Sequence, residues 1–305
     1  MKKIIQVLGP SGVGKTELSI KIARDFNGEI ISADSIQVYK EFDIGSDKIE
    51  KDERQGIKHY LIDIIDNCEQ FNASKFLELS FDVSEKIVSR GKLPIICGGT
   101  ALYLRTMIKG IFEEKESDVN YRNILKSLVE VKGSGFLWEK LNEIDPDYAE
   151  KIGKNDKKRI IRGLEIYYKN GVSPTEIFKK TKSPFFEYEF IRIGLNLERQ
   201  LLYERINKRV DKMIEKGLVK EVRKLVKKYG KDCPPFTAIG YKEVLMFLDG
   251  KIGYEDMIEL IKKNSRNFAK RQLSWFRNEN NIEWFKPYDY ESIKEYLKRR
   301  LWKEH

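Results

Sequence analysis

The chain has 305 residues, of which 41% are hydrophobic and 35% are charged, a composition that excludes a disordered chain and a collagen-like repeat. No apolar run approaches the roughly 18–20 residues of a membrane-spanning helix, and the N-terminal apolar stretch is too short for a signal peptide, so we expect no membrane association. Two histidines and three scattered cysteines argue against a disulfide framework, a structural zinc site and a multi-histidine metal centre, and they favour a reducing cytoplasm.

The net charge of +10 is concentrated in the C-terminal part of the chain. Residues 1–115 contain 17 Lys and Arg against 18 Asp and Glu, whereas the remaining residues contain 41 basic and 30 acidic ones. This asymmetry favours a catalytic part joined to a surface that binds a polyanion. A solvated, lysine-rich surface is the alternative explanation.

The N-terminal part alternates between apolar strands and helices, which predicts an α/β fold with a three-layer core and a mostly parallel sheet. The strands are expected at 3–8, 28–35, 60–65 and 92–99, and the helices at 15–25 and 71–90. After Lys115, the spacing of the apolar residues becomes that of amphipathic helices. Helices are expected at 121–132, 136–143, 147–152 and 156–169, and they are followed by a turn-rich stretch to about residue 185.

A strand at 189–197 returns the chain to the sheet, and a helical C-terminal part follows it. Its helices are expected at 198–216, 218–229, 241–249, 254–263 and 265–277. We therefore predict a core made of residues 1–115 and 186–305, with an all-helical insertion domain at 116–185. No internal repeat or low-complexity segment is present.

A glycine-rich loop joins the first strand to the first helix and reads GPSGVGKT, residues 9–16, which matches G-x-x-x-x-G-K-[ST] in the required strand–loop–helix context. Its amides and the helix N-terminus would bind a di- or triphosphate. Lys15 would reach the terminal phosphates, and Thr16 would ligate Mg²⁺. This motif alone does not identify the reaction, because kinases, NTPases and transferases of diphosphate substrates all use such a loop.

Polar groups also follow two other strands at the same predicted edge of the sheet. Asp34 follows the second strand, and Gly98-Gly99-Thr100 closes the fourth. Ligands of open α/β sheets bind at this edge, where Asp34 would be a base or a metal contact. Capping of a turn by Asp34 and a plain strand–helix turn at Thr100 are the structural alternatives.

Basic residues gather on three expected helices. Arg205 and Arg209 lie four residues apart and would clamp a diphosphate. The segment SRNFAKRQLSWFR, 265–277, interleaves basic and aromatic residues and would contact a phosphate backbone, as would the cluster at 157–162. Ordinary solvated helix faces are the alternatives. His59 and Cys97 are expected to be structural.

Eight segments resemble, in order, those of the tRNA dimethylallyltransferases, also called tRNA isopentenyltransferases. They read GPSGVGKT, ISADSIQVYKEFDIGS, GIKHYLIDI, GKLPIICGGTALY, NDKKRIIRGLEIY, LLYERINKRVDKMIEKGLVKEV, TAIGYKE and AKRQLSWFRN. The resemblance implies a P-loop NTPase-like core. It also implies transfer of the dimethylallyl group from dimethylallyl diphosphate to the exocyclic amine of the adenine 3′ to the tRNA anticodon, with Mg²⁺ as cofactor.

The resemblance also implies roles for individual residues. Asp34 would be the general base, and Thr100 would bind near the reacting centre. The diphosphate would be bound by Gly9, Pro10, Ser11, Gly12, Val13, Gly14, Lys15, Thr16 and Arg209. The tRNA would be contacted by Ser35, Ile36, Gln37, Thr100, Arg122, Lys158, Arg159, Ile160, Ile161, Arg162, Gly240, Tyr241, Lys242, Arg266, Lys270 and Arg271. The anticodon stem-loop would be gripped by the insertion and the basic C-terminal part of a monomeric cytoplasmic protein.

The chain departs from the family pattern at several positions. Ser11-Gly12 replaces the usual Thr-Ala and makes the loop similar to that of guanylate kinases, while DIGSDKI replaces the usual D-I-G-T-A-K-P and places Asp47 where alanine is common. His59-Tyr60 replaces a histidine pair, and no C-terminal zinc finger is expected. A P-loop nucleotide or metabolite kinase, an adenylate isopentenyltransferase and a non-catalytic RNA-binding protein are the alternative functions.

Overall fold

The computed structural model describes residues 1–66, 68–112 and 118–302. The chain forms two compact units. Unit 1 consists of residues 1–108 together with 184–305, and unit 2 consists of residues 109–183. Each unit has a hydrophobic core of its own, so each is described by itself.

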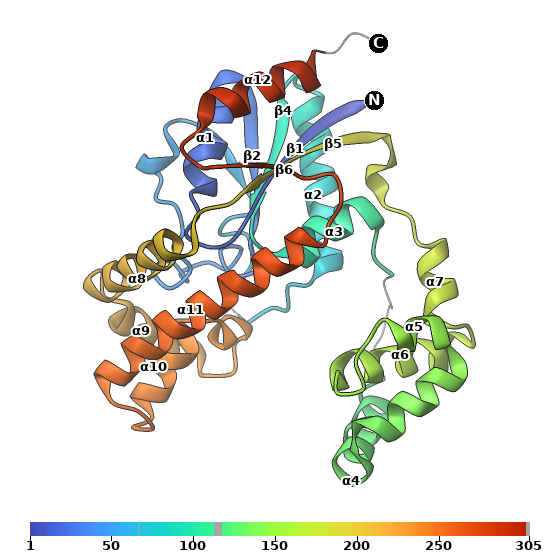
Figure 1. The fold of residues 1–305 in the computed structure, drawn as a ribbon. Coiled ribbons are helices and arrows are strands. Elements are labelled where there is room, and N and C mark those ends of the chain that lie inside the picture. The colour runs from blue at the N-terminus through green and yellow to red at the C-terminus, as the bar shows by residue number, and fades with distance from the viewer. Residues whose placement is uncertain (67, 113–117, 303–305) are drawn as a thin grey trace. The chain divides into compact units, whose positions relative to one another are not determined.

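Unit 1 is built on a six-stranded sheet in which every neighbouring pair is parallel (Figure 1). Its strands are β1 (Lys2–Leu8), β2 (Gly28–Ala33), β3 (His59–Tyr60), β4 (Leu93–Gly98), β5 (Tyr188–Leu195) and β6 (Glu283–Phe285). Their order in space is β3-β2-β4-β1-β5-β6. The α/β class with a P-loop-like core is therefore confirmed.

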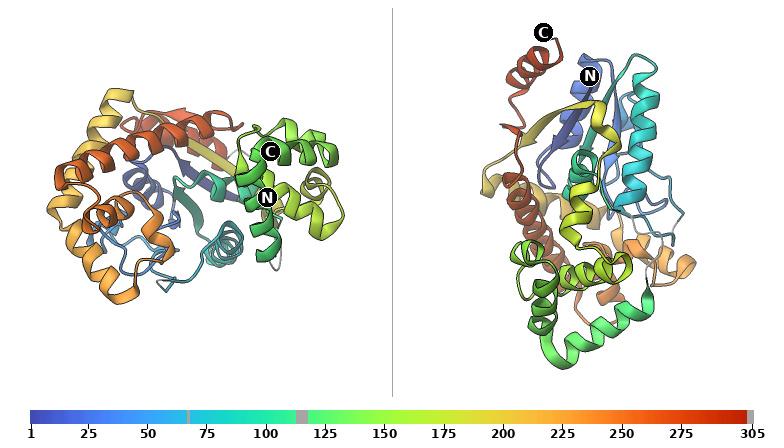
Figure 2. Two further views of the ribbon diagram at one scale, coloured as in Figure 1. Left: turned by 90° about the horizontal axis from the view of Figure 1, so that it is seen from below. Right: turned by 90° about the vertical axis from the view of Figure 1, so that its right-hand side faces the viewer.

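Helices cover both faces of the sheet because successive strand residues point to opposite sides and most of them are buried apolar residues. Helices α1 (Lys15–Asp25) and α12 (Tyr290–Leu301) pack on the face that carries Ile5, Val7 and Ile193. The other face is covered by α2 (Ala73–Val88) and α3 (Ala101–Lys109), and there the buried Gln6 amide donates to the Leu104 carbonyl. The strands lie between α12 and α2 in the right-hand view of Figure 2.

The C-terminal part of unit 1 is helical. It comprises α8 (Arg199–Glu215), α9 (Leu218–Tyr229), α10 (Tyr241–Leu248) and α11 (Tyr254–Arg277). The sequence predicts two helices where α11 is continuous. Asn264, at the expected break, stays helical and its side-chain amide donates to the buried Glu243 carboxylate at 2.7 Å.

Unit 2 is entirely helical among its described residues. It comprises α4 (Val119–Ile144, kinked at Gly133), α5 (Pro146–Glu150), α6 (Lys157–Asn170) and α7 (Pro174–Lys180). Asp118, Asp145, Asp156 and Ser173 cap the four helix N-termini through their side-chain oxygens. Helix α7 lies in the stretch expected to be turns, where the Ser173 cap and Pro174 at the first helical position start a helix.

The structure differs from the sequence-based elements at several other places. The expected strand at 60–65 is reduced to His59–Tyr60 because Leu61 and Asp63 have positive φ angles, which end the ladder. The sequence analysis predicted no elements at α3, β6 and α12. Strand β6 has only three residues, too few for a periodic pattern.

Cys68 and Cys233 form a disulfide within unit 1, with Cα atoms 4.6 Å apart. The scattered cysteines predict that the chain has no disulfide framework, and this expectation is wrong for Cys68 and Cys233. The two residues are 165 positions apart, so only the packing of Cys68 and Cys233 against Tyr229 at the end of α9 reveals that they meet. Cys97 is a free thiol.

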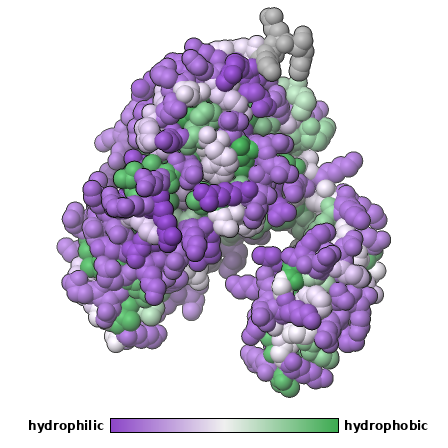
Figure 3. All heavy atoms as spheres, in the orientation of Figure 1, coloured by the Kyte–Doolittle hydropathy of each residue, from purple (hydrophilic) through white to green (hydrophobic). Residues whose placement is uncertain are grey.

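Hydrophilic side chains cover most of the face visible in Figure 3. Apolar residues appear there as scattered small groups, as is usual for a folded domain. Among the helices in the described part of the chain, none has the length and the apolar run that crossing a membrane requires.

Candidate active site

The phosphate-binding loop lies between β1 and α1, as the motif requires. Gly9 has a φ of 147°, and a Cβ atom at this position would lie 2.7 Å from the Leu195 carbonyl oxygen. Only glycine fits there, because it tolerates both the positive φ and the close backbone approach. Gly14 precedes α1, so the helix N-terminus opens toward the space that an anion would occupy.

Lys15 is the first residue of α1, and its ammonium group donates to the Pro10 carbonyl at 2.8 Å. Burial, opposed by Cys97 and Asp34 and assisted by the nearby Arg209, lowers the pKa of Lys15 to about 8. The loop therefore holds a cation that lacks full hydration. A bound phosphate would supply the missing counter-charge.

Asp34 directly follows β2 and caps the turn after it. Its Oδ1 accepts hydrogen bonds from the Ile36 amide at 2.8 Å and the Gln37 amide at 3.2 Å. The structural role expected as an alternative for Asp34, capping of the turn, is therefore observed. The second carboxylate oxygen accepts no hydrogen bond within the described residues, so capping leaves one oxygen for chemistry.

Gly98, Gly99 and Thr100 close β4 beside the end of β2. Gly98 pairs with Ala33 in the ladder, and the Thr100 amide donates to the Ala33 carbonyl at 3.3 Å. Thr100 therefore lies next to the strand end that carries Asp34. Its carbonyl accepts from the Leu104 amide at the start of α3.

Gln272 of α11 joins this turn to the phosphate loop, a role that the sequence analysis did not predict. Its side chain is 6% exposed, and its amide nitrogen donates to the Gly99 carbonyl at 2.8 Å. Its oxygen accepts from the Ser11 amide, also at 2.8 Å. The Ser11 amide therefore has an internal partner, and binding of the diphosphate by Ser11 stays a prediction.

The phosphate-binding loop, Asp34 and the Gly98-Gly99 turn line one cavity of about 880 Å³ within unit 1, and Thr100 and Gln272 lie outside the set of residues that line it. The residues after β1, β2 and β4 meet here because the carboxyl ends of adjacent parallel strands share an edge. One wall comes from α8 and carries cationic side chains. These are Arg205, Lys208, Arg209 and Lys212. The cavity thus joins a cationic wall to the Asp34 carboxylate.

The segment 42–48 forms another wall of the cavity and is held by the Glu221 carboxylate of α9. Glu221 accepts from the amides of Asp43, Ile44 and Gly45 at 2.7–3.2 Å, and also from the Tyr241 hydroxyl at 2.8 Å. Next in this segment, Asp47 forms an ion pair with Arg209 at 3.2 Å. The expected diphosphate ligand Arg209 therefore has an internal partner.

The residues predicted to contact tRNA in unit 1 differ in exposure. Ser35, Ile36 and Gln37 are partly exposed, and Lys242, Lys270 and Arg271 are exposed. Arg266 is partly exposed and donates to Asn207. Gly240 and Tyr241 are both buried, and the Gly240 amide donates to Glu243. The Tyr241 side chain belongs to the core, and the contact of the 240–242 segment with tRNA stays a prediction.

The predicted tRNA contacts in unit 2 lie on α4 and α6. Lys158 and Arg159 are exposed, and Arg162 is partly exposed. Ile160 and Ile161 are buried in the core of unit 2, and their contact with tRNA stays a prediction. Arg122 forms a two-pronged ion pair with the buried Glu165, so it stabilises α4 against α6.

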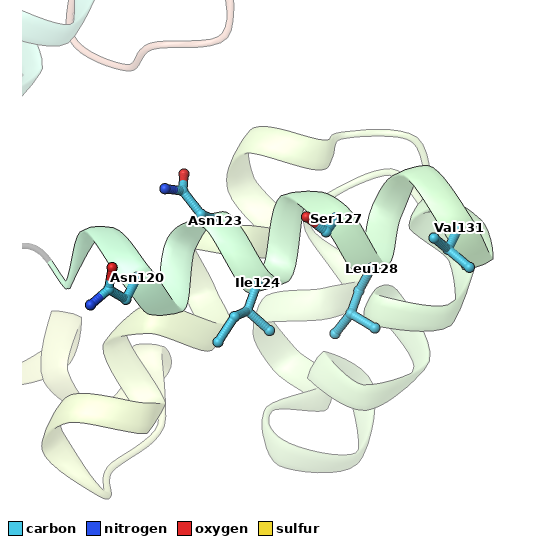
Figure 4. A pocket seen from close by; sticks show the side chains of 6 residues that line it. All are labelled: Asn120, Asn123, Ile124, Ser127, Leu128 and Val131. Carbon is cyan, nitrogen blue, oxygen red and sulfur yellow. The ribbon is translucent and has the colours of Figure 1, made fainter.

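A second hollow, of about 490 Å³, lies along α4 in unit 2 and contains none of the candidate residues (Figure 4). All the side chains that line it come from a single helix. Asn120, Asn123 and Ser127 are its polar members, and none of the described residues that line it is titratable. It therefore offers no acid–base or anion-binding chemistry.

Comparison with known proteins decides the family. A family model described as IPP transferase matches residues 37–279. A tRNA dimethylallyltransferase of Thermoanaerobacter sp. (strain X514) is 45% identical over 304 residues, covering 98% of this chain and 96% of the relative. One of Bacillus cytotoxicus is 43% identical over 298 residues, covering 97% and 94%. The chain belongs to the tRNA dimethylallyltransferase family.

Solved structures of tRNA dimethylallyltransferases share the fold. The tRNA isopentenylpyrophosphate transferase of Bacillus halodurans aligns with a TM-score of 0.74 at 40% identity, covering 99% of this chain and 97% of that one. A eukaryotic dimethylallyltransferase acting on tRNA aligns at 0.81 and 33% identity, covering 99% and 78%. Family membership favours a prenyltransferase over the kinase alternative.

Proposed function

We propose that this chain transfers the dimethylallyl group of dimethylallyl diphosphate to the exocyclic N6 amine of the adenine 3′-adjacent to the anticodon of tRNA. The observation that carries this proposal is the single cavity in which a phosphate-binding loop, a cationic helix and the Asp34 carboxylate meet. Membership of the tRNA dimethylallyltransferase family supports the choice of substrates.

The proposed chemistry gives each of these groups a role. The amine lone pair is delocalised into the adenine ring, so the amine is a weak nucleophile. As the new C–N bond forms, Asp34 accepts the proton from nitrogen, and the C–O bond to the diphosphate breaks. Lys15, Arg209 and the loop amides stabilise the negative charge that develops on the leaving diphosphate. Thr100 hydrogen-bonds near the reacting centre.

Mg²⁺ is the cofactor that we propose. The Thr16 hydroxyl is exposed at the loop and supplies a hard oxygen ligand, which suits Mg²⁺ together with diphosphate oxygens. The described residues contain no group of three or more His, Cys, Asp or Glu side chains that could bind a metal alone. Thr16 would therefore hold the ion only with the substrate present, and the ion would neutralise diphosphate charge.

We propose that the tRNA is gripped by both units. A stacked base cannot reach the cavity, so the adenine must be flipped out of the anticodon stem-loop. Exposed basic side chains on α11 and α6 suit the phosphate backbone of that stem-loop. We further propose that the protein acts as a monomer in the cytoplasm, where tRNA is available.

Incubation with radiolabelled dimethylallyl diphosphate, Mg²⁺ and an unmodified anticodon stem-loop tests this function. AMP and ATP serve as parallel acceptors. We expect label in the RNA, and its loss when the target adenine is replaced by guanine. Label only in AMP or ATP would instead identify an adenylate isopentenyltransferase. ATP consumption with no transfer would identify a kinase.

The role of unit 2 is tested by replacing Lys158 and Arg159 with alanine together. We expect about a tenfold weaker affinity for the stem-loop and a shallower salt dependence, because two phosphate contacts are lost. Electrophoretic mobility shifts at several salt concentrations measure both. The matched control replaces the exposed Lys169 and Lys179 of unit 2. Equal effects of the two pairs would contradict a specific contact on α6.

A further inference from the structure

The ion pair between Asp47 and Arg209 places a carboxylate against the cationic α8 wall of the cavity. Asp47 Oδ2 lies 3.2 Å from Arg209 Nε, and the Asp47 side chain is 55% exposed. Among the cavity-lining residues nearby, α8 contributes Arg205, Lys208, Arg209 and Lys212. Asp47 therefore already pairs with the guanidinium that the proposed diphosphate would also contact.

The surrounding contacts fix Asp47 at this position. The Asp47 carbonyl accepts from the Gln37 side-chain amide at 3.2 Å, and the Ser46 hydroxyl donates to the Phe42 carbonyl at 2.7 Å. On the other side, Lys48 has a side chain that is only 5% exposed and donates to the Tyr39 carbonyl. The carboxylate is thus presented to Arg209 by a segment that is bound on both sides.

We propose that Asp47 competes with the diphosphate for Arg209, so that it sets diphosphate affinity and assists product release. This inference rests on the proposed function, because it assumes that the cavity binds a diphosphate. Arg209 must exchange the Asp47 carboxylate for a diphosphate oxygen when substrate binds. The reverse exchange returns Arg209 to Asp47 when diphosphate leaves.

Asp47→Asn is the appropriate variant. Asp47 has a φ of 51°, a conformation that asparagine and aspartate adopt more readily than other non-glycine residues. Asparagine therefore removes the charge and leaves the backbone unstrained, whereas alanine would change both. Glu50→Gln is the matched control, because Glu50 follows in the same segment and also lines the cavity, but it pairs with Lys216, at 2.7 Å, and not with Arg209.

Titration calorimetry with inorganic pyrophosphate and Mg²⁺ measures the competition. We expect Asp47→Asn to bind pyrophosphate about two- to fivefold more tightly, because this variant lacks a partly exposed ion pair that competes with the ligand. Glu50→Gln should bind pyrophosphate within about twofold of the parent protein. In the Arg209→Ala background, Asp47→Asn should not change the affinity for pyrophosphate, since the guanidinium for which Asp47 competes is absent. Steady-state assays should show a lower KM for dimethylallyl diphosphate.

The outcomes separate this inference from the proposed function. Unchanged or weaker pyrophosphate binding in Asp47→Asn would overturn the competition and make Asp47 a residue that merely positions Arg209. Equal tightening in Glu50→Gln would reduce the effect to general charge removal and overturn it as well. If Lys15→Ala binds pyrophosphate as tightly as the parent, the cavity is not the diphosphate site and the proposed function itself fails.

Discussion

Asp34 uses its two carboxylate oxygens differently, which allows its chemical role to be tested without unfolding its turn. Asparagine retains the Oδ1 acceptor for the Ile36 and Gln37 amides but cannot accept the proton of the attacking amine. We expect Asp34→Asn to lower the single-turnover rate by about 10²–10⁴-fold and to leave tRNA affinity within a few-fold. Rapid-quench and filter-binding assays measure the two quantities.

The alternative outcome for Asp34 is equally clear. A rate near that of the parent would mean that Asp34 only caps the turn. Asp34→Ala distinguishes the two roles further, because it removes the cap as well as the base. If only the alanine variant is impaired, the carboxylate is structural.

Lys15 predicts a pH dependence of diphosphate binding. Because burial lowers its pKa to about 8 in the free protein, Lys15 loses its charge as the pH rises through about 8. A bound diphosphate favours the ammonium form and raises this pKa, so the contribution of Lys15 to affinity is complete below pH 8 and declines above it. Pyrophosphate titrations between pH 6.5 and 9.5 measure the decline.

Lys15→Arg is the control for this titration, since a guanidinium remains protonated over the whole range. Pyrophosphate also ionises, and dividing the affinities of the two proteins removes that common effect. The ratio of parent to variant affinity should fall above pH 8. Parallel curves for the two proteins would show that Lys15 does not titrate in this range.

At the scale of elements, α11 is linked to the site by a single buried amide. Gln272→Met keeps the side-chain volume but leaves the Ser11 amide and the Gly99 carbonyl without partners. We expect the free energy of unfolding to fall by about 1–3 kcal/mol and pyrophosphate binding to weaken. Urea unfolding and calorimetry measure these changes.

Ser274→Met is the matched change on the exposed side of α11. It should alter stability by less than about 0.5 kcal/mol. If both variants behave alike, the effect belongs to the helix and not to the bridge between the two loops.

Local sequence patterns predicted the elements that have a clear period. Strand β1, the loop after it and α1 follow from an apolar run, spaced glycines and helical periodicity within residues 2–25. The end of the strand expected at 60–65 was not predictable, because the apolar run gives no sign of the positive φ angles of Leu61 and Asp63. Helix α12 was also not predicted, because only two of its apolar side chains, Ile293 and Leu297, are fully buried, and two positions are too few to give a clear helical period.

At the scale of the whole molecule, the site was predictable only where chain order determines position. The strand ends that carry Lys15, Asp34 and Thr100 meet because parallel strands share an edge. Gln272 contacts Ser11, which lies 261 residues away in the sequence, and Glu221 contacts Ile44, which lies 177 residues away. Contacts over such separations leave no local pattern in the sequence, so the roles of these two residues could not be predicted. The buried position of Tyr241 likewise follows from its packing among Phe42 and Phe236.

The disulfide between Cys68 and Cys233 has a consequence for the covalent topology of the chain. All of unit 2, residues 109–183, lies between the two cysteines. Oxidised protein is therefore a closed ring that contains the whole helical insertion, with two open tails. Cleavage of one peptide bond anywhere in unit 2 opens the ring, but the disulfide keeps the two fragments joined.

A protease site inserted after the exposed Lys154, between α5 and α6, tests this topology. In protein purified without reductant, the cleaved chain should migrate as one species on a denaturing gel and separate into two fragments once a thiol is added. Cys233→Ser should give two fragments in either condition. Two fragments from the parent without reductant would show that the cysteines are not joined. If the ring holds, the insertion can be nicked, exchanged or permuted while the two halves of the catalytic core remain one molecule.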